Sequence, residues 1–157
     1  MQKSDVTLIP TNITDSADSS SVLVSLISSM KSCLNAVSVA GQTHDISPEE
    51  WLILEALQEK DGLTGLTMSE FRKNSIGGAS SLTRAVDRLV SRALVFREIG
   101  QQDRRQILVH ISALGRSVHA DMNHDIQKLE RDIKEQFLAK GIDPQKLTHV
   151  LGEIFTK

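Results

Sequence analysis

The sequence has no tyrosine, a single tryptophan and a single cysteine among its 157 residues. With Cys33 alone, an intramolecular disulfide is excluded, and the composition fits a reducing compartment. There is no unbroken run of 18 apolar residues, so the sequence predicts no membrane span. The opening residues 1–5 lack the apolar stretch of a signal peptide. We therefore expect a cytoplasmic protein with a mainly aliphatic core.

Recognisable catalytic and metal-binding patterns are also missing. The glycines at 77–78 lack the preceding strand and following lysine of a phosphate-binding loop, and no nucleophile stands in an elbow motif. We therefore expect no enzyme and no cofactor. His119, Asp121 and His124 are close in sequence but too few for a zinc site, so solvated side chains are the expectation. Cys33 lies on an apolar stripe, which favours a buried, inert thiol over a redox sensor.

Residues 79–94 form the most informative stretch that is present. Its apolar residues, spaced as one stripe of an α-helix, are Leu82, Ala85, Val86, Leu89 and Ala93. Arginines recur every four residues on another face, at Arg84, Arg88 and Arg92. Ser80 and Ser81 fall in the first turn. The helix thus has one side for a core and one for an anion, and the major groove of B-DNA admits such a helix.

The charge distribution agrees with this interpretation. Residues 71–110 contain eight lysines or arginines and three acids, a net charge of +5, whereas the whole chain has −2 and the remainder therefore −7. Local charge is what a phosphate experiences, so the low overall charge does not exclude nucleic acid. The alternative is an ordinary solvated helix face, and the basic hairpin that follows weighs against it.

A helix-turn-helix and a hairpin surround this charge. Thr67 and Glu70 form a predicted capping box that opens a short helix to about residue 74, and a glycine-containing turn leads to the arginine helix. Runs 94–99 and 105–111 then predict two strands joined by a charged turn. A hairpin with arginines at its tip, following a helix-turn-helix, indicates a wing whose arginines enter the minor groove.

The basic and acidic residues at the wing tip are expected to have different roles. Arg104 or Arg105 is the expected minor-groove residue. Asp103 has the wrong sign to face DNA, so we expect its carboxylate to brace the guanidinium of Arg105 in a fixed fork.

Helices are predicted on both sides of the winged module. The first begins at Asp18 as a cap, runs to about residue 40 and stops at Gly41. Its two overlapping apolar stripes require two partners, or one from another subunit. The next helix starts with a capping box at Ser47, followed by Pro48 and Glu50.

The C-terminal part is also helical by pattern. Ser112 caps a long helix to about residue 140, and a last helix begins at residues 143–144. The sequence thus predicts a mainly α fold with a small β-hairpin wing: a winged helix-turn-helix with long N- and C-terminal dimerisation helices. The expected divisions are 1–17 flexible, 18–157 a single domain, a winged module at about 47–112, and dimerisation helices at about 18–40 and 113–157.

The stretch from Asp103 to Arg116 resembles the wing signature of the MarR family of bacterial regulators, D-x-R followed by V-x-L-T and x-x-G. Ile111 stands for the leucine and Ser112 for the threonine. The segments 82–89 and 94–97 resemble the recognition helix and first wing strand of that family. The motifs span about residues 47 to 116, and the order of helices extends the likeness to most of the chain.

This resemblance implies a homodimer that binds a palindromic operator, usually as a repressor, and that is released by a small phenolic or other anionic ligand. It assigns DNA contacts to Ser80, Ser81, Thr83, Arg84, Arg88, Arg97, Asp103, Arg104 and Arg105. One departure is Ala93, where the family usually has glycine. Since glycine suits a left-handed helix end, alanine there costs about 1 kcal/mol, and we expect the helix end and the angle of the wing to differ slightly from the family pattern.

Two alternatives remain open from the sequence. One is a winged-helix protein-interaction module that binds no DNA, although such a module would not need a basic tip beside a basic helix. The other is a DNA-binding regulator that needs no ligand. The effector, the operator and the sign of regulation do not follow from the residues.

Overall fold

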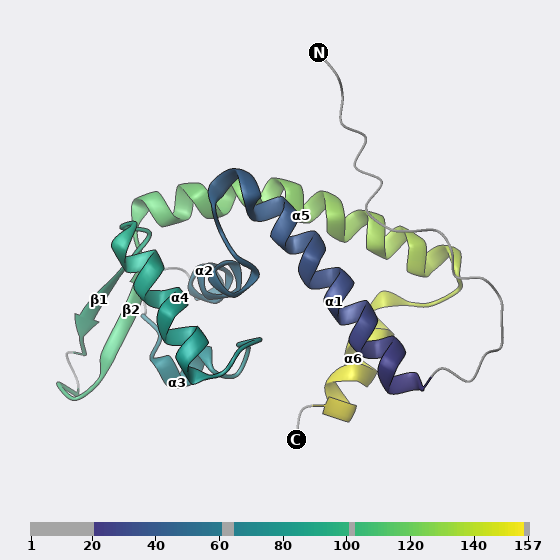
Figure 1. Ribbon diagram of the computed structural model, residues 1–157, viewed down its shortest axis with the longest axis horizontal. Coiled ribbons are helices and arrows are strands. Elements are labelled where there is room, and N and C mark those ends of the chain that lie inside the picture. Colours follow the sequence, from purple (N-terminus) through teal and green to yellow (C-terminus); the bar gives the residue numbers. More distant parts are fainter. Residues whose placement is uncertain (1–20, 61–64, 101–102, 156–157) are drawn as a thin grey trace, which may run out of the picture.

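Figure 1 shows the computed structural model, which describes residues 21–60, 65–100 and 103–155. The elements in order are α1 (Val22–Gly41), η1 (Gln42–His44), α2 (Pro48–Glu59), α3 (Met68–Phe71), α4 (Ala79–Ser91), β1 (Val95–Ile99), β2 (Ile107–Ile111), α5 (Ala113–Ala139) and α6 (Pro144–Phe155). The predicted mainly helical fold with one hairpin is confirmed. The predicted loose segment 1–17 and the cap at Asp18 lie outside the described residues.

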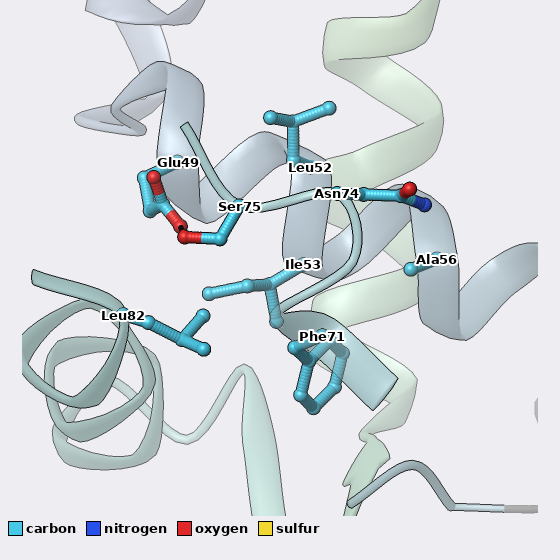
Figure 2. Close-up of a pocket in the computed structure, with 8 residues that line it drawn as sticks. All are labelled: Glu49, Leu52, Ile53, Ala56, Phe71, Asn74, Ser75 and Leu82. Atoms are coloured by element: carbon cyan, nitrogen blue, oxygen red, sulfur yellow. Dashed lines mark hydrogen bonds between the residues drawn. The ribbon is translucent and has the colours of Figure 1, made fainter. Parts of the chain in front are cut away.

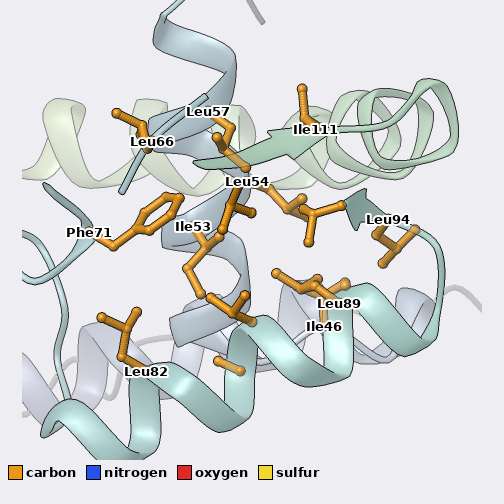
Figure 3. Packing of buried hydrophobic residues seen from close by; sticks show 14 of the residues in the cluster. Ile46, Ile53, Leu54, Leu57, Leu66, Phe71, Leu82, Leu89, Leu94 and Ile111 are labelled. Carbon is orange, nitrogen blue, oxygen red and sulfur yellow. The ribbon is translucent and has the colours of Figure 1, made fainter. Parts of the chain in front are cut away.

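Helices α2, α3 and α4 and the hairpin gather into one body, and α5 runs from the base of the hairpin along the whole length of the molecule (Figure 1). Strand β1 pairs antiparallel with β2, and Leu66 adds an isolated bridge to Val109. The core lies between α2, α4, the hairpin and the first half of α5 (Figure 3). Its fully buried side chains include Ile53, Leu54, Leu57, Leu82, Val86, Leu89, Leu94, Val109, Ile111 and Met122.

The predicted helix starts are confirmed by their hydrogen bonds. Ser47 and Glu50 form a reciprocal capping box at α2, with Pro48 in the first position, and Thr67 and Glu70 form another at α3. At α5, the Ser112 hydroxyl accepts the Gly115 N–H at 2.9 Å. Each of these signals is local, so residues three apart determine where the helix begins. Helix α3 is shorter than expected, since it ends at Phe71 rather than near residue 74.

The capping box of α3 gives a test of acid sensitivity. The backbone N–H of Thr67, together with Lys60, lowers the pKa of Glu70 from 4.5 to about 2. Because the folded-state pKa is depressed, this contribution to stability is complete above pH 4.5 and is lost as the pH falls toward 2. Glu70→Gln is expected to flatten that part of the stability profile, measured as the urea midpoint at several pH values. The effect is modest because the Glu70 side chain is 39% exposed.

The exposed acid Glu59 at the end of α2 supplies the control. Glu59 is not part of a capping box, so Glu59→Gln is expected to keep the wild-type loss of stability in acid that the capping box of α3 causes. An equal slope for wild type and Glu70→Gln would contradict the capping role.

Two expectations concern helix ends. Helix α1 ends at Gly41, as expected, where φ is −81°, and the chain continues through η1 to Asp45 at φ 52°. A Cβ at Gly41 would collide with the carbonyl oxygen of Ile46. Ala93 adopts the left-handed conformation, with φ 56°, so the expected departure from the helix end that glycine forms is not seen. It is exposed, so it does not extend the buried stripe of α4.

Two further expectations are corrected by the structure. Cys33 is exposed on α1 rather than buried. His119 is buried instead of solvated, and its Nε2 lies 2.6 Å from the Glu55 carboxylate of α2.

The segment Val22–His44 is long and apolar enough to span a membrane by length and composition, with a mean hydropathy of 1.5, although it holds no unbroken apolar run. A helix that packs against another protein surface has the same composition.

Candidate nucleic-acid interface

The outward face of α4 holds the side chains that the sequence assigned to the major groove. Ser80, Ser81, Thr83 and Arg84 are all exposed, and Ser80 and Ser81 lie in the first turn. The Thr83 hydroxyl donates to the Ala79 carbonyl at 2.9 Å, which turns its methyl group outward. The opposite face buries Leu82, Ala85, Val86 and Leu89. Helix α4 is therefore fixed by one face, and the other is free to bind.

The turn before α4 is held by a buried carboxylate from α2. Glu49 is only 7% exposed, and it accepts the Ser75 hydroxyl at 2.6 Å and the backbone N–H groups of Ile76 and Gly77 at 3.2 and 3.1 Å. Figure 2 shows Glu49 and Ser75 facing each other at this turn. A side chain at Gly77 would press against Ser81. Sequence reasoning missed this contact, because Glu49 lies 26 to 28 residues away from its partners.

Arg88 has a structural partner that the sequence did not indicate. Its Nε lies 3.0 Å from Oε1 of Glu50, a carboxylate that is 1% exposed, and its Nη2 lies 3.5 Å from the exposed Asp45. That Glu50 oxygen has no well-aligned hydrogen bond, so the contact with Arg88 is a charge pair. The Arg88 side chain remains 54% exposed. It joins α4 to α2 and keeps an edge of its guanidinium open to solvent.

Arg92, the third arginine of the stripe and the residue that follows α4, faces the connection after α1. Its guanidinium donates to the backbone carbonyls of Asp45 and His44, the latter at 2.6 Å. The geometry thus divides the arginine stripe. Arg84 points outward, Arg88 is shared between the core and the surface, and Arg92 fastens the helix to the rest of the chain.

The wing is attached to α4 by an ion pair. Arg97 of β1, an expected DNA contact, lies 2.6 Å from Oδ1 of Asp87 on α4. Both side chains are partly exposed. The pair links the hairpin to α4, so Arg97 has a partner within the fold.

Asp103 has a different partner from the one expected. Its Oδ1 accepts the backbone N–H of Arg105 at 2.9 Å, and its own carbonyl accepts the Gln106 N–H at 3.0 Å. The predicted fork to the Arg105 guanidinium is thus replaced by a turn in which an aspartate binds the backbone two residues on. Arg104 and Arg105 remain exposed at the tip.

Two further features of the described residues concern metal and ligand binding. No group of three or more His, Cys, Asp or Glu side chains in ranges 21–60, 65–100 and 103–155 is placed to hold a metal ion. The cavity behind the α3–α4 turn, shown in Figure 2, has a volume of about 10 Å³. That is space for about one water molecule.

Comparison with known proteins supports the fold. No protein-family model matches this chain, and no curated protein matches it in sequence. Solved structures do match. Transcriptional regulator BldR from Sulfolobus solfataricus has a TM-score of 0.70 at 24% identity, over 85% of this chain and 92% of that one. A mutant of MarR from E. coli in complex with operator DNA has a TM-score of 0.65 at 20% identity, over 85% and 91%.

A further similar structure is BpsR from Bordetella bronchiseptica, whose DNA binding is regulated by 6-hydroxynicotinic acid. Its TM-score is 0.72 at 15% identity, over 88% of this chain and 96% of that one. The chain therefore has the fold of MarR-type regulators, the winged helix-turn-helix with long flanking helices. At these identities the likeness concerns the fold.

Proposed function

We propose that this chain is a DNA-binding transcriptional regulator that reads the major groove with α4 and the minor groove with the wing tip. The observation that carries the proposal is the placement of two basic, exposed features on one side of the molecule. The N-terminal end of α4 and the tip of the hairpin lie toward the same edge of the molecule (Figure 1). Ser80, Ser81 and Arg84 are exposed on α4, and Arg104 and Arg105 are exposed at the hairpin tip. Adjacent major and minor grooves accept such a pair.

A palindromic operator would match a dimer, and the exposed apolar surface supports one. Helix α1 leaves Val22, Leu23, Val24, Leu26, Ile27 and Met30 between 37% and 76% exposed, and α6 leaves Ile154 and Phe155 at 59% and 63%. A monomer in water rarely exposes so much apolar surface. We propose a twofold homodimer in the cytoplasm, in which these helices intertwine. Sedimentation showing a monomer at micromolar concentration would contradict it.

Ligand release and repression are the finer parts of the proposal. BpsR responds to 6-hydroxynicotinic acid, and a structure of NadR holds 4-hydroxyphenylacetate. We propose by analogy a small phenolic or other anionic effector that lowers the affinity for the operator.

The wing tip gives a test that separates charge from shape. Because Asp103 holds the backbone N–H of Arg105, Asp103→Asn keeps an acceptor oxygen and is expected to bind DNA within about twofold of the wild type. Asp103→Ala is expected to weaken binding by opening the turn, and Arg105→Ala to weaken it and reduce the salt dependence by about one phosphate contact per wing. The measurement is fluorescence titration of one operator at two salt concentrations.

Two outcomes contradict this account of the wing. Equal losses of DNA affinity for Asp103→Asn and Asp103→Ala would instead support the predicted fork between the Asp103 carboxylate and the Arg105 guanidinium. Tighter binding by Asp103→Ala would mean that the carboxylate only repels DNA, and would overturn the wing assignment. The double variant Asp103→Ala/Arg105→Ala is expected to resemble Arg105→Ala alone.

The proposed function is tested by selecting bound duplexes from a random pool with the full chain. The expected product is an enriched palindrome with half-sites about one helical turn apart, as each protomer places one α4 in a major groove. Affinity should fall steeply with salt. Recovery of no enriched sequence, with salt-independent behaviour, would favour the protein-interaction module.

A further inference from the structure

Two exposed isoleucines face α4 between the core and the wing tip. Ile99 of β1 and Ile107 of β2 are direct cross-strand partners and are 63% and 53% exposed. Side chains alternate along a strand, so Ile99 shares a face with Arg97, and Ile107 shares it with the fully buried Val109. Since Arg97 contacts Asp87 of α4 and Val109 enters the core, this face of the hairpin is the one turned toward α4.

If the protein binds DNA as proposed, the isoleucine pair faces the DNA strand that separates the two grooves. When a helix lies in a major groove and a wing tip enters the adjacent minor groove, one sugar–phosphate strand runs between them. The hairpin face toward α4 looks onto that strand. Arg84 on α4 and Arg104 and Arg105 at the wing tip are exposed and supply positive charge on the two elements that would enter the grooves. The deoxyribose groups of the same strand present mainly carbon and hydrogen.

We propose that Ile99 and Ile107 form an apolar contact surface for the deoxyribose groups of the strand between the two grooves. This inference rests on the proposed DNA binding and adds a sequence-independent, salt-independent contribution to it. The competing explanation is that the pair only stabilises the hairpin through cross-strand packing. Substitution by threonine distinguishes DNA contact from hairpin packing, because threonine also favours strands but lacks the larger apolar side chain of isoleucine.

The experiment uses the full chain and a duplex that the wild type has selected from a random pool. Ile99→Thr/Ile107→Thr is expected to raise Kd about tenfold at constant salt, since apolar surface is lost at both wings of a dimer. The slope of log Kd against log salt is expected to stay as in the wild type, because no cation is removed. Hydroxyl-radical cleavage, which attacks deoxyribose, should reappear at the sugars between the two grooves.

Leu108→Thr is the matched control, because Leu108 pairs with Glu98 on the opposite face of the same hairpin. It is expected to keep the wild-type Kd and footprint, and thermal unfolding of all variants reports whether the hairpin is intact. An unchanged Kd and footprint for the double variant would overturn the inference while leaving DNA binding in place. A changed sedimentation coefficient with unchanged Kd would assign the pair to a second copy and also overturn it. Failure of the wild type to select any duplex would refute the proposed function itself.

Discussion

Gly115→Ala is expected to lower the free energy of unfolding by about 2–4 kcal/mol, because overpacking against backbone has no flexible side chain to yield. A Cβ at Gly115 would collide with the carbonyl oxygen of Leu94 and press within 2.9 Å of the Ile111 side chain. Those atoms belong to the link between α4 and β1 and to the end of β2. The substitution would therefore push the first turn of α5 off the base of the wing. Urea unfolding of the purified variant measures the loss.

Gly152→Ala is the matched control for this substitution. It makes the same exchange inside helix α6, where an added Cβ meets nothing within 4 Å. Alanine is the better helix former, so this variant is expected to gain up to about 1 kcal/mol. Equal behaviour of the two variants would contradict the close packing of α5 on the wing.

Arg88→Ala is expected to destabilise the fold by about 2 kcal/mol, because it leaves the buried carboxylate of Glu50 without its positive partner. This loss of unfolding free energy is smaller than is usual on breaking a fully buried ion pair, because the Arg88 side chain is half exposed. The loss should appear in urea unfolding without any DNA present. Arg84→Ala, on the exposed face of the same helix, is expected to leave the unfolding midpoint unchanged.

A second substitution identifies the cause. Glu50→Gln in the Arg88→Ala background removes the unpaired charge and keeps an oxygen for the Ser47 N–H, so part of the stability should return. If Arg88→Ala unfolded like the wild type and lost only DNA affinity, Arg88 would be a plain DNA contact, as the sequence alone had suggested.

Local patterns in the sequence were sufficient for most of the secondary structure. The capping boxes at Ser47 and Thr67 depend on residues three apart, and the buried stripe of α4 follows from its helical spacing. Such features are determined within a few residues, so no knowledge of the tertiary structure was required. The helix end at Ala93 was not predicted in this way, because alanine in place of glycine pointed to a slightly different end, whereas Ala93 keeps the left-handed conformation.

The contacts that position the candidate interface could not be predicted in this way. Glu49 reaches the turn before α4 across 26 to 28 residues, and His119 pairs with Glu55 across 64. Arg92 binds backbone carbonyls, which carry no sequence signal at all. The turn at Asp103, in contrast, could have been predicted from the sequence, because an aspartate two residues before the backbone donor is the spacing of a common side-chain turn.

The most direct test of the central claim is the binding of Arg84→Ala to the selected duplex and to a shuffled duplex of equal length. Arg84 is exposed on α4 and, within the described residues, has no ion-pair partner. If α4 reads bases, the variant loses about 1–3 kcal/mol of specific binding, and its preference at one base pair of each half-site relaxes. Unchanged affinity for the selected duplex together with an unchanged sequence preference would show that α4 is not the reading helix.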